Sequence, residues 1–130
     1  MGQTLEMLLA AEPAKVKNVP TGQIEIKRLS KQLGQPFIVT FRAGTLDELK
    51  SIGENADGNE TEEMKWAIYE LTTDPSFKDK GLRERFGVAR PVDIVDNILL
   101  GGEVLMLYQA IMKSSGFDKD TGTDVEAVKN

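Results

Sequence analysis

The side chains able to do chemistry in this sequence are few in kind, because the chain contains neither histidine nor cysteine. Histidine is the usual general base, proton shuttle and transition-metal ligand near neutral pH. The missing cysteines exclude disulfides, thiolate zinc sites and thiol catalysis. Only carboxylates, lysine, tyrosine and serine remain, so we expect a protein that is not an enzyme and that needs no cofactor or metal.

Two groups of carboxylates come closest to a reactive or metal-binding pattern. Residues 118–126 carry acidic side chains at alternating positions, as calcium loops do. An EF-hand, however, needs glycine at its sixth position and glutamate at its twelfth, where Thr123 and Lys129 stand. Asp93 and Asp96 are spaced like an acid–base pair on one face of an expected helix. We interpret the first group as a solvated acidic tail and the second as the solvent-exposed side of that helix.

A basic stretch runs through residues 78–90 and contains Lys78, Lys80, Arg83, Arg85 and Arg90, diluted by Asp79 and Glu84. A nucleic-acid site would need interleaved aromatic residues for base stacking. Only Phe77 and Phe86 are present, and both are better explained as anchors in a hydrophobic core. The net charge of −5 also disfavours binding to a phosphate backbone. We expect no nucleic-acid partner, and read the stretch as a solvated helix face or a contact for an acidic partner.

The candidate partner-binding residues are apolar and aromatic. Leu5, Leu8 and Leu9 form a stripe on a short N-terminal helix, which is too short to be stable alone in water. This stripe either closes the protein's own core or contacts a partner. Trp66 and Tyr69 lie three residues apart on a later helix. They either pack in the core against the strands or anchor an interface, where both residue types are enriched.

The length and composition are those of one folded domain. The chain has 130 residues, of which 40% are hydrophobic and 28% charged, which is outside the range of disordered sequences. The N-terminal residues carry no basic leader, and Glu6 interrupts their apolar run. We therefore expect no signal peptide, no membrane association and a cytoplasmic location.

Two strands are predicted in the first third of the chain. Residues 23–29 begin with apolar–polar alternation that turns Ile24 and Ile26 inward. Residues 36–43 alternate as well, with Phe37, Val39 and Phe41 on one face and Ile38, Thr40 and Arg42 on the other. The connection between the two segments is short, which favours an antiparallel hairpin.

Helices are predicted from residue 45 onward. Thr45 and Glu48 have the spacing of a capping box and open a helix through residue 54. Further helices are expected over residues 60–72, over a segment that begins at Asp74 and Pro75 and ends at Gly87, over residues 92–100, and over residues 103–115. The glycines at positions 101 and 102 are expected to separate the last two, and Gly116 is expected to end the last one. The helix over residues 60–72 is expected to have one apolar stripe, formed by Met64, Ala67, Ile68 and Leu71.

These elements predict an α+β fold that is predominantly helical, with a small N-terminal antiparallel β-hairpin packed on a bundle of four or five short helices. Residues 1–20 are expected to form an N-terminal helical arm and linker. Residues 21–117 would form a single α+β domain, and residues 118–130 a polar, flexible tail.

Two stretches of the sequence resemble the XkdN-like family of phage and prophage tail assembly chaperones. The first runs from residue 24 to residue 49 and reads IEIKRLS, GQPFIVTFRA and TLDEL, like the strand, strand and capped helix of that family. The second reads LRERFG, PVDIV, ILLGGEV and SGF between residues 82 and 117, like the family's helical C-terminal half. Gly101 departs from the pattern, because a less flexible residue, often proline, is expected before the Gly–Glu pair.

The resemblance implies a non-catalytic protein of the host bacterial cytoplasm with no active-site residues. Such chaperones hold the long tape measure protein while tail tube subunits polymerise around it, and they are absent from the finished tail. The implied partners are the tape measure protein and the tail tube protein, and homo-oligomerisation is left open. The alternative is a small structural tail or connector protein, which would be found in purified virions.

Overall fold

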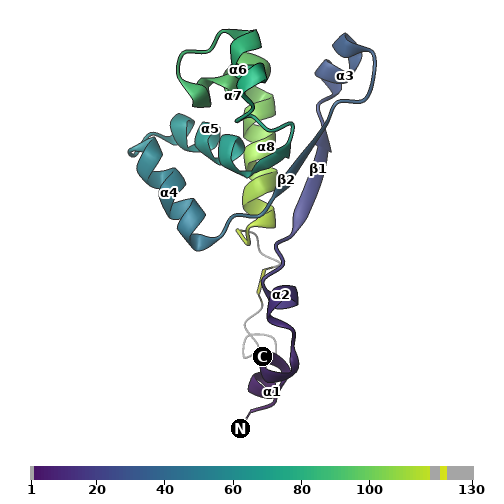
Figure 1. Cartoon of the computed structure of the whole chain (residues 1–130), viewed down its shortest axis with the longest axis vertical. Coiled ribbons are helices and arrows are strands. Elements are labelled where there is room, and N and C mark those ends of the chain that lie inside the picture. Colours follow the sequence, from purple (N-terminus) through teal and green to yellow (C-terminus); the bar gives the residue numbers. More distant parts are fainter. Residues whose placement is uncertain (1, 118–120, 123–130) are drawn as a thin grey trace, which may run out of the picture.

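The computed structural model describes residues 2–117, 121 and 122, and has an α+β architecture (Figure 1). Its helical elements are α1 Gln3–Ala10, α2 Pro13–Val16, α3 Lys27–Leu33, α4 Leu46–Ala56, α5 Glu60–Leu71, α6 Lys80–Phe86, η1 Pro91–Asp93, α7 Ile94–Ile98 and α8 Gly101–Ser114. Its strands are β1 Thr21–Glu25, β2 Ile38–Arg42 and β3 Thr72–Asp74. The α+β prediction is therefore confirmed.

The sheet has the strand order β1-β2-β3 and is antiparallel throughout. The predicted antiparallel pairing of β1 with β2 is confirmed, with Ile24 opposite Val39, and Val39 and Phe41 are buried. The third strand was not predicted. It follows α5 without a break and pairs with the other edge of β2, with an irregularity between Thr40 and Phe41. The sheet is therefore more than an N-terminal hairpin, because residues from the middle of the chain complete it.

The predicted strand over residues 23–29 is correct only at its start, because β1 ends at Glu25 and α3 begins at Lys27. The apolar residues Ile26, Leu29 and Leu33 recur at helical rather than strand spacing, and Ile26 and Leu29 are buried. Gly34 then ends the helix in the left-handed conformation, with φ 78°. The helical spacing of residues 26–33 follows directly on the strand-like alternation of β1, so the sequence pattern alone did not separate the two elements.

The capped helix α4 and the helix α5 form as predicted. The Thr45 hydroxyl accepts a hydrogen bond from the Glu48 backbone amide, and the Glu48 carboxylate accepts one from the Thr45 amide. In α5 the Asn59 side chain accepts from the amide of Glu62. Ala67, Ile68 and Leu71 of the predicted apolar stripe are buried, and Met64 is half-buried.

The predicted helix start at Asp74 and Pro75 is wrong. Asp74 is the last residue of β3, and α6 begins only at Lys80, where the Asp79 carboxylate accepts a hydrogen bond of 2.9 Å from the amide of Leu82. Both aspartates are good N-cap residues, so local sequence did not distinguish them. The predicted helix end at Gly87 is confirmed.

The predicted helix over residues 92–100 consists of two elements, η1 and α7. The helical segment ends at Ile98, before the two glycines rather than at them. Leu99 is buried and Leu100 adopts an extended conformation, after which α8 begins at Gly101. The Glu103 carboxylate accepts a hydrogen bond of 2.8 Å from the Leu100 amide and so caps α8.

Helix α8 lies in the middle of the body and packs against α5 on one side and against β1 and β2 on the other (Figure 1). The core between them contains Ile26, Val39, Phe41, Ile52, Ile68, Leu71, Phe77, Ile94, Leu107 and Ile111, among others. Among the described residues no single helix is long and apolar enough to cross a membrane. Pro91–Ile98 and Gly101–Ser114 meet that length and composition only as a pair, bent by 114°.

Two predictions concern the end of the chain, where little is described. Gly116 follows α8 with φ 101°, as expected of a residue that ends a helix. Apart from Thr121 and Gly122, the expected tail of residues 118–130 and its acidic segment lie outside the described residues.

Candidate partner-binding surfaces

The N-terminal helix α1 extends away from the body together with α2 (Figure 1). None of its residues is buried. The side chains of the predicted stripe, Leu5, Leu8 and Leu9, are 45%, 58% and 69% exposed. In the structure these leucines therefore do not contribute to the protein's own core.

Trp66 and Tyr69 meet each other on the body of the protein, far along the chain from the arm. Their rings are 5.7 Å apart and nearly perpendicular, at 83°, and the Lys78 ammonium lies 5.8 Å from the Tyr69 ring centre. Both residues are half-buried and pack against the hydrophobic core. The structure brings these two predicted residues together, but it does not place them beside the leucines of α1.

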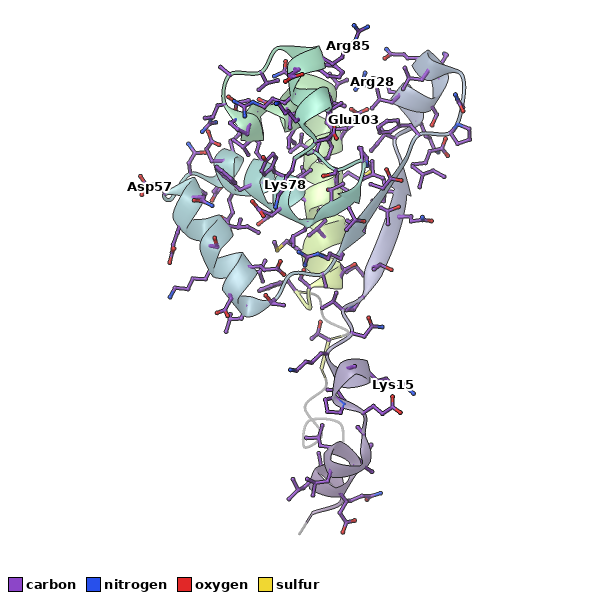
Figure 2. The ribbon with its side chains drawn as sticks, in the orientation of Figure 1. Lys15, Arg28, Asp57, Lys78, Arg85 and Glu103 are labelled. Atoms are coloured by element: carbon purple, nitrogen blue, oxygen red, sulfur yellow. The ribbon has the colours of Figure 1, made fainter. Side chains whose placement is uncertain are left out.

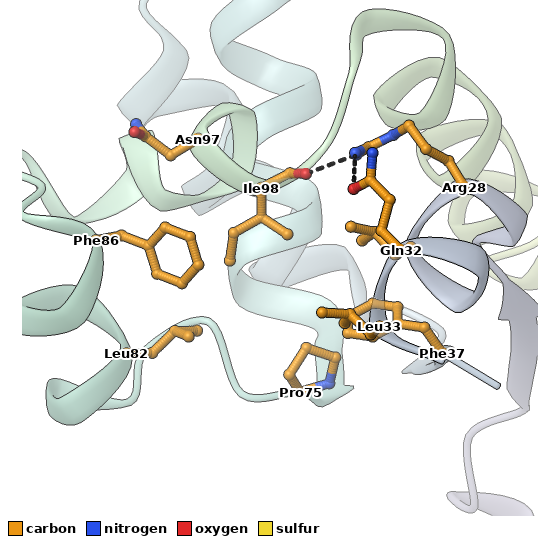
Figure 3. Close-up of a pocket in the computed structure, with 10 residues that line it drawn as sticks. Arg28, Gln32, Leu33, Phe37, Pro75, Leu82, Phe86, Asn97 and Ile98 are labelled. Atoms are coloured by element: carbon orange, nitrogen blue, oxygen red, sulfur yellow. Dashed lines mark hydrogen bonds between the residues drawn. The ribbon is translucent and has the colours of Figure 1, made fainter. Parts of the chain in front are cut away.

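Sequence reasoning missed an apolar groove between α3 on one side and α6 and α7 on the other, with a volume of about 480 Å³ (Figure 3). Its apolar lining consists of Leu29, Leu33, Phe37, Pro75, Leu82, Phe86 and Ile98. Leu33 and Phe86 are 60% and 46% exposed. Two predictions concealed the groove: the first residues of α3 are predicted as the end of a strand and the others as a connector, and Phe86 is predicted in the core.

Arg28 holds the two walls of this groove together (Figure 3). Its guanidinium donates hydrogen bonds to the Glu103 carboxylate at 2.8 and 3.0 Å, to the Ile98 carbonyl at 2.9 Å and to the Gln32 side chain at 3.2 Å. The hydrogen bond from Arg28, and to a lesser extent that from the Leu100 amide, lowers the pKa of Glu103. The charged pair thus links α3 to the start of α8 and keeps the groove preformed.

Two of the helices that line the groove, α3 and α6, are basic although the whole chain is acidic. Helix α3 carries Lys27, Arg28 and Lys31 with no acidic residue, and α6 carries Lys80, Arg83 and Arg85 with one, Glu84. Arg28 and Arg85 appear at the same end of the body in Figure 2, opposite the arm marked by Lys15. An apolar groove with basic flanks suits an amphipathic helix whose polar face is acidic.

The predicted solvent-exposed pair Asp93 and Asp96 instead belongs to an ion-pair network around a buried lysine. The Lys65 ammonium lies 2.5 Å from the Asp93 carboxylate and 3.4 Å from that of Asp96, and Lys65 is only 6% exposed. Arg90 contacts Asp93 at 2.8 Å and Glu62 at 2.5 Å. The interpretation as a wholly solvent-exposed face is therefore wrong for Asp93, although Asp96 is exposed.

The electrostatics of this network fit a structural rather than a catalytic role. Hydrogen bonds from Arg90 and then from Lys65 lower the pKa of Asp93 to about 2. Burial by itself lowers the pKa of Lys65, but the hydrogen bond to Asp93 and the charge of Asp96 outweigh it and raise the pKa. Both groups stay charged near neutral pH, where a general acid or base needs a pKa close to the working pH. The network ties η1 and α7 to α5, and α7 contributes Asn97 and Ile98 to one wall of the groove.

The fold is similar to a solved structure, the crystal structure of the protein yqbn, with a TM-score of 0.63 and 24% sequence identity. The match covers 83% of this chain and 98% of that one. Among curated proteins, none matches this chain.

The family comparison covers nearly the whole chain. The model of the phage XkdN-like tail assembly chaperone family matches residues 5–129, a span that begins within α1 and includes both walls of the groove. It agrees with the resemblance carried by the two halves of the sequence. The chain therefore belongs to the XkdN-like family of phage tail assembly chaperones.

Proposed function

We propose that this tail assembly chaperone acts without catalysis, by binding apolar helical segments of the tape measure protein in the groove between α3, α6 and α7. It would do so in the host cytoplasm while the tail tube assembles around the tape measure chain. The observation that carries the proposal is the groove itself, which is apolar, open to solvent and flanked by basic helices.

The groove offers the features of a helix-binding site. Leu33 and Phe86 present exposed apolar surface on its opposite walls, and burying such surface against a partner supplies the main favourable free energy of association. The walls are held in place by Arg28 and by the Lys65 network, so little ordering cost falls on the chaperone when it binds.

The residues predicted from sequence are weaker candidates for this contact. Trp66 and Tyr69 are half-buried against the core, which leaves less of their surface for a partner. Leu5, Leu8 and Leu9 are exposed, but α1 presents them on an extended arm and not in a preformed cavity. A role for these five residues in binding the tape measure protein stays a prediction.

Co-expression with the tape measure protein tests the proposal. Leu33→Ser and Phe86→Ser remove exposed apolar surface from the groove, so we expect less soluble tape measure protein with either variant. Leu46→Ser on α4 is the matched control, because Leu46 is 83% exposed and does not line the groove. Melting temperatures of the isolated variants separate lost binding from lost folding.

Two results would contradict the proposal. One is undiminished solubility of the tape measure protein with both groove variants when these still fold. The other is the presence of the chain in stoichiometric amount in purified phage tails, which would favour the structural tail or connector protein instead.

A further inference from the structure

Helix α1 is unusual in leaving every one of its large apolar side chains in solvent. Besides the three leucines of its stripe, Met7 is 67% exposed. The helix has eight residues, and its N-cap, Gly2, provides no side-chain hydrogen bond. A helix of this length gains its stability from packing, so α1 needs a surface on which to dock.

The groove provides such a surface in the same chain. Leu5, Leu8 and Leu9 share one face of α1, because they stand at i, i+3 and i+4. The groove presents a complementary apolar lining of leucine, phenylalanine, proline and isoleucine side chains.

Charge also favours this pairing. The only charged residue of α1 is Glu6, whereas α3 carries Lys27 and Lys31 in addition to the Arg28 that pairs with Glu103, and α6 has a net charge of +2. Glu6 lies beside the leucine stripe on the helical wheel, so it would lie near the basic helices α3 and α6 when the stripe is buried.

The position of the arm points to the groove of another molecule. Helix α1 lies at one end of the molecule, and α3 and α6 lie at the other (Figure 1). The Pro20 carbonyl accepts a hydrogen bond of 2.8 Å from the Ala43 amide, which fixes the point where the arm leaves the sheet. From there β1 runs toward α3 while the arm runs away from it. Docking within one molecule would require the linker to reverse direction.

We propose that α1 of one copy docks in the groove of a second copy, and that the exchange is reciprocal. The result is a two-fold symmetric dimer held by two identical arm–groove contacts, which covers the apolar surface of both partners. In the absence of cargo the arm occupies the site where the tape measure helix would bind. The chaperone thus protects its own groove until a cargo segment displaces the arm.

Analytical ultracentrifugation of the full-length protein over micromolar concentrations tests this arrangement. We expect the wild type to dimerise, and the double variants Leu5→Ser/Leu8→Ser and Leu33→Ser/Phe86→Ser to be monomeric. Met7→Ser is the matched control on α1, because Met7 is exposed on the side of the helix opposite the stripe, and this variant should dimerise like the wild type.

Mixing the two double variants gives the decisive measurement. One then supplies an intact groove and the other an intact arm, so a single arm–groove contact can form. We expect heterodimers in the mixture, weaker than the wild-type dimer, although each variant alone is monomeric. Circular dichroism melts of both variants confirm that they are folded.

A wild type that stays monomeric, or an arm variant that dimerises as strongly as the wild type, would overturn the proposal. So would folded, individually monomeric variants that fail to associate when mixed. No tape measure protein is present in these experiments. A negative result would therefore overturn the arm–groove dimer without testing the proposed binding of the tape measure protein.

Discussion

The Glu48 side chain both caps a helix and links that helix to the sheet. Its carboxylate accepts from the Thr45 amide in the capping box of α4 and also pairs with the Arg42 guanidinium at 2.5 and 2.8 Å. The hydrogen bond from Arg42 is the main cause that lowers the pKa of Glu48 to about 2, and the Thr45 contacts add to it. One residue thus starts a helix and fastens it to the last residue of β2.

We predict that this carboxylate contributes stability that is lost in acid. Because the pKa of Glu48 is lower in the folded protein than its usual value near 4.3, the contribution is present above that value and disappears as the pH falls toward about 2. Glu48→Gln keeps a capping side chain but cannot ionise. The melting temperature of the wild type should therefore exceed that of the variant near pH 6, and the difference should shrink between about pH 4.5 and pH 2.

Asp47→Asn serves as the control, because it removes an exposed carboxylate from the same turn of α4 without touching the Arg42 pair. A difference between wild type and Glu48→Gln that stays constant over this pH range would show that the ion pair contributes no pH-dependent stability.

At the scale of elements, the glycines show where backbone conformation matters and where it does not. Gly53 lies inside α4, and a Cβ added there would meet no atom within 4 Å. Gly87 ends α6 with φ +62°, a conformation that residues with a side chain adopt at a cost. Substitution by alanine is therefore expected to raise the free energy of unfolding at position 53 and to lower it at position 87.

We predict that Gly53→Ala stabilises the protein by about 0.5–1 kcal/mol, because alanine loses less conformational entropy in a helix. Gly87→Ala should destabilise it by about 1–2 kcal/mol through the left-handed conformation. Urea unfolding followed by circular dichroism measures both. Equal effects of the two substitutions would contradict the assigned roles of these glycines.

At the scale of the whole molecule, the arm and the body differ in how they are stabilised. The body has a continuous core that joins the sheet to α5 and α8, whereas no residue of α1 or α2 is buried. Val19 is half-buried and Pro20 bonds to the sheet, so the structural boundary falls just before Val19.

We predict that deleting residues 2–18 leaves the melting temperature within a few degrees of that of the full-length protein, because no buried surface is lost. The two melting temperatures should be measured at concentrations too low for self-association, because dimerisation raises an apparent melting temperature. Ile68→Ala, at a position with 0% exposure, is the contrasting change and should cost about 2–5 kcal/mol. A large drop on arm deletion would instead assign the arm to the core.

The sequence by itself determined the features that depend on neighbouring residues. The capping box at Thr45 and Glu48, the stripe of α5 and the helix end at Gly87 were predicted correctly. Each rests on contacts within one helical turn or on one backbone angle, so the local residues contain the information. The pairing of β1 with β2 was predicted for a similar reason, since the two strands are close in the chain.

Only the tertiary structure decided the features that need distant residues. Strand β3 forms because α5 ends beside the free edge of β2, where the next three residues can pair. A segment of three residues is too short to show a strand pattern in the sequence. Asp93 pairs with Lys65, 28 residues away, and Arg28 pairs with Glu103, 75 residues away. The groove arises where such pairs hold α3 beside α6 and α7. No local periodicity encodes it, because its surface exists only once segments far apart in the chain have packed together.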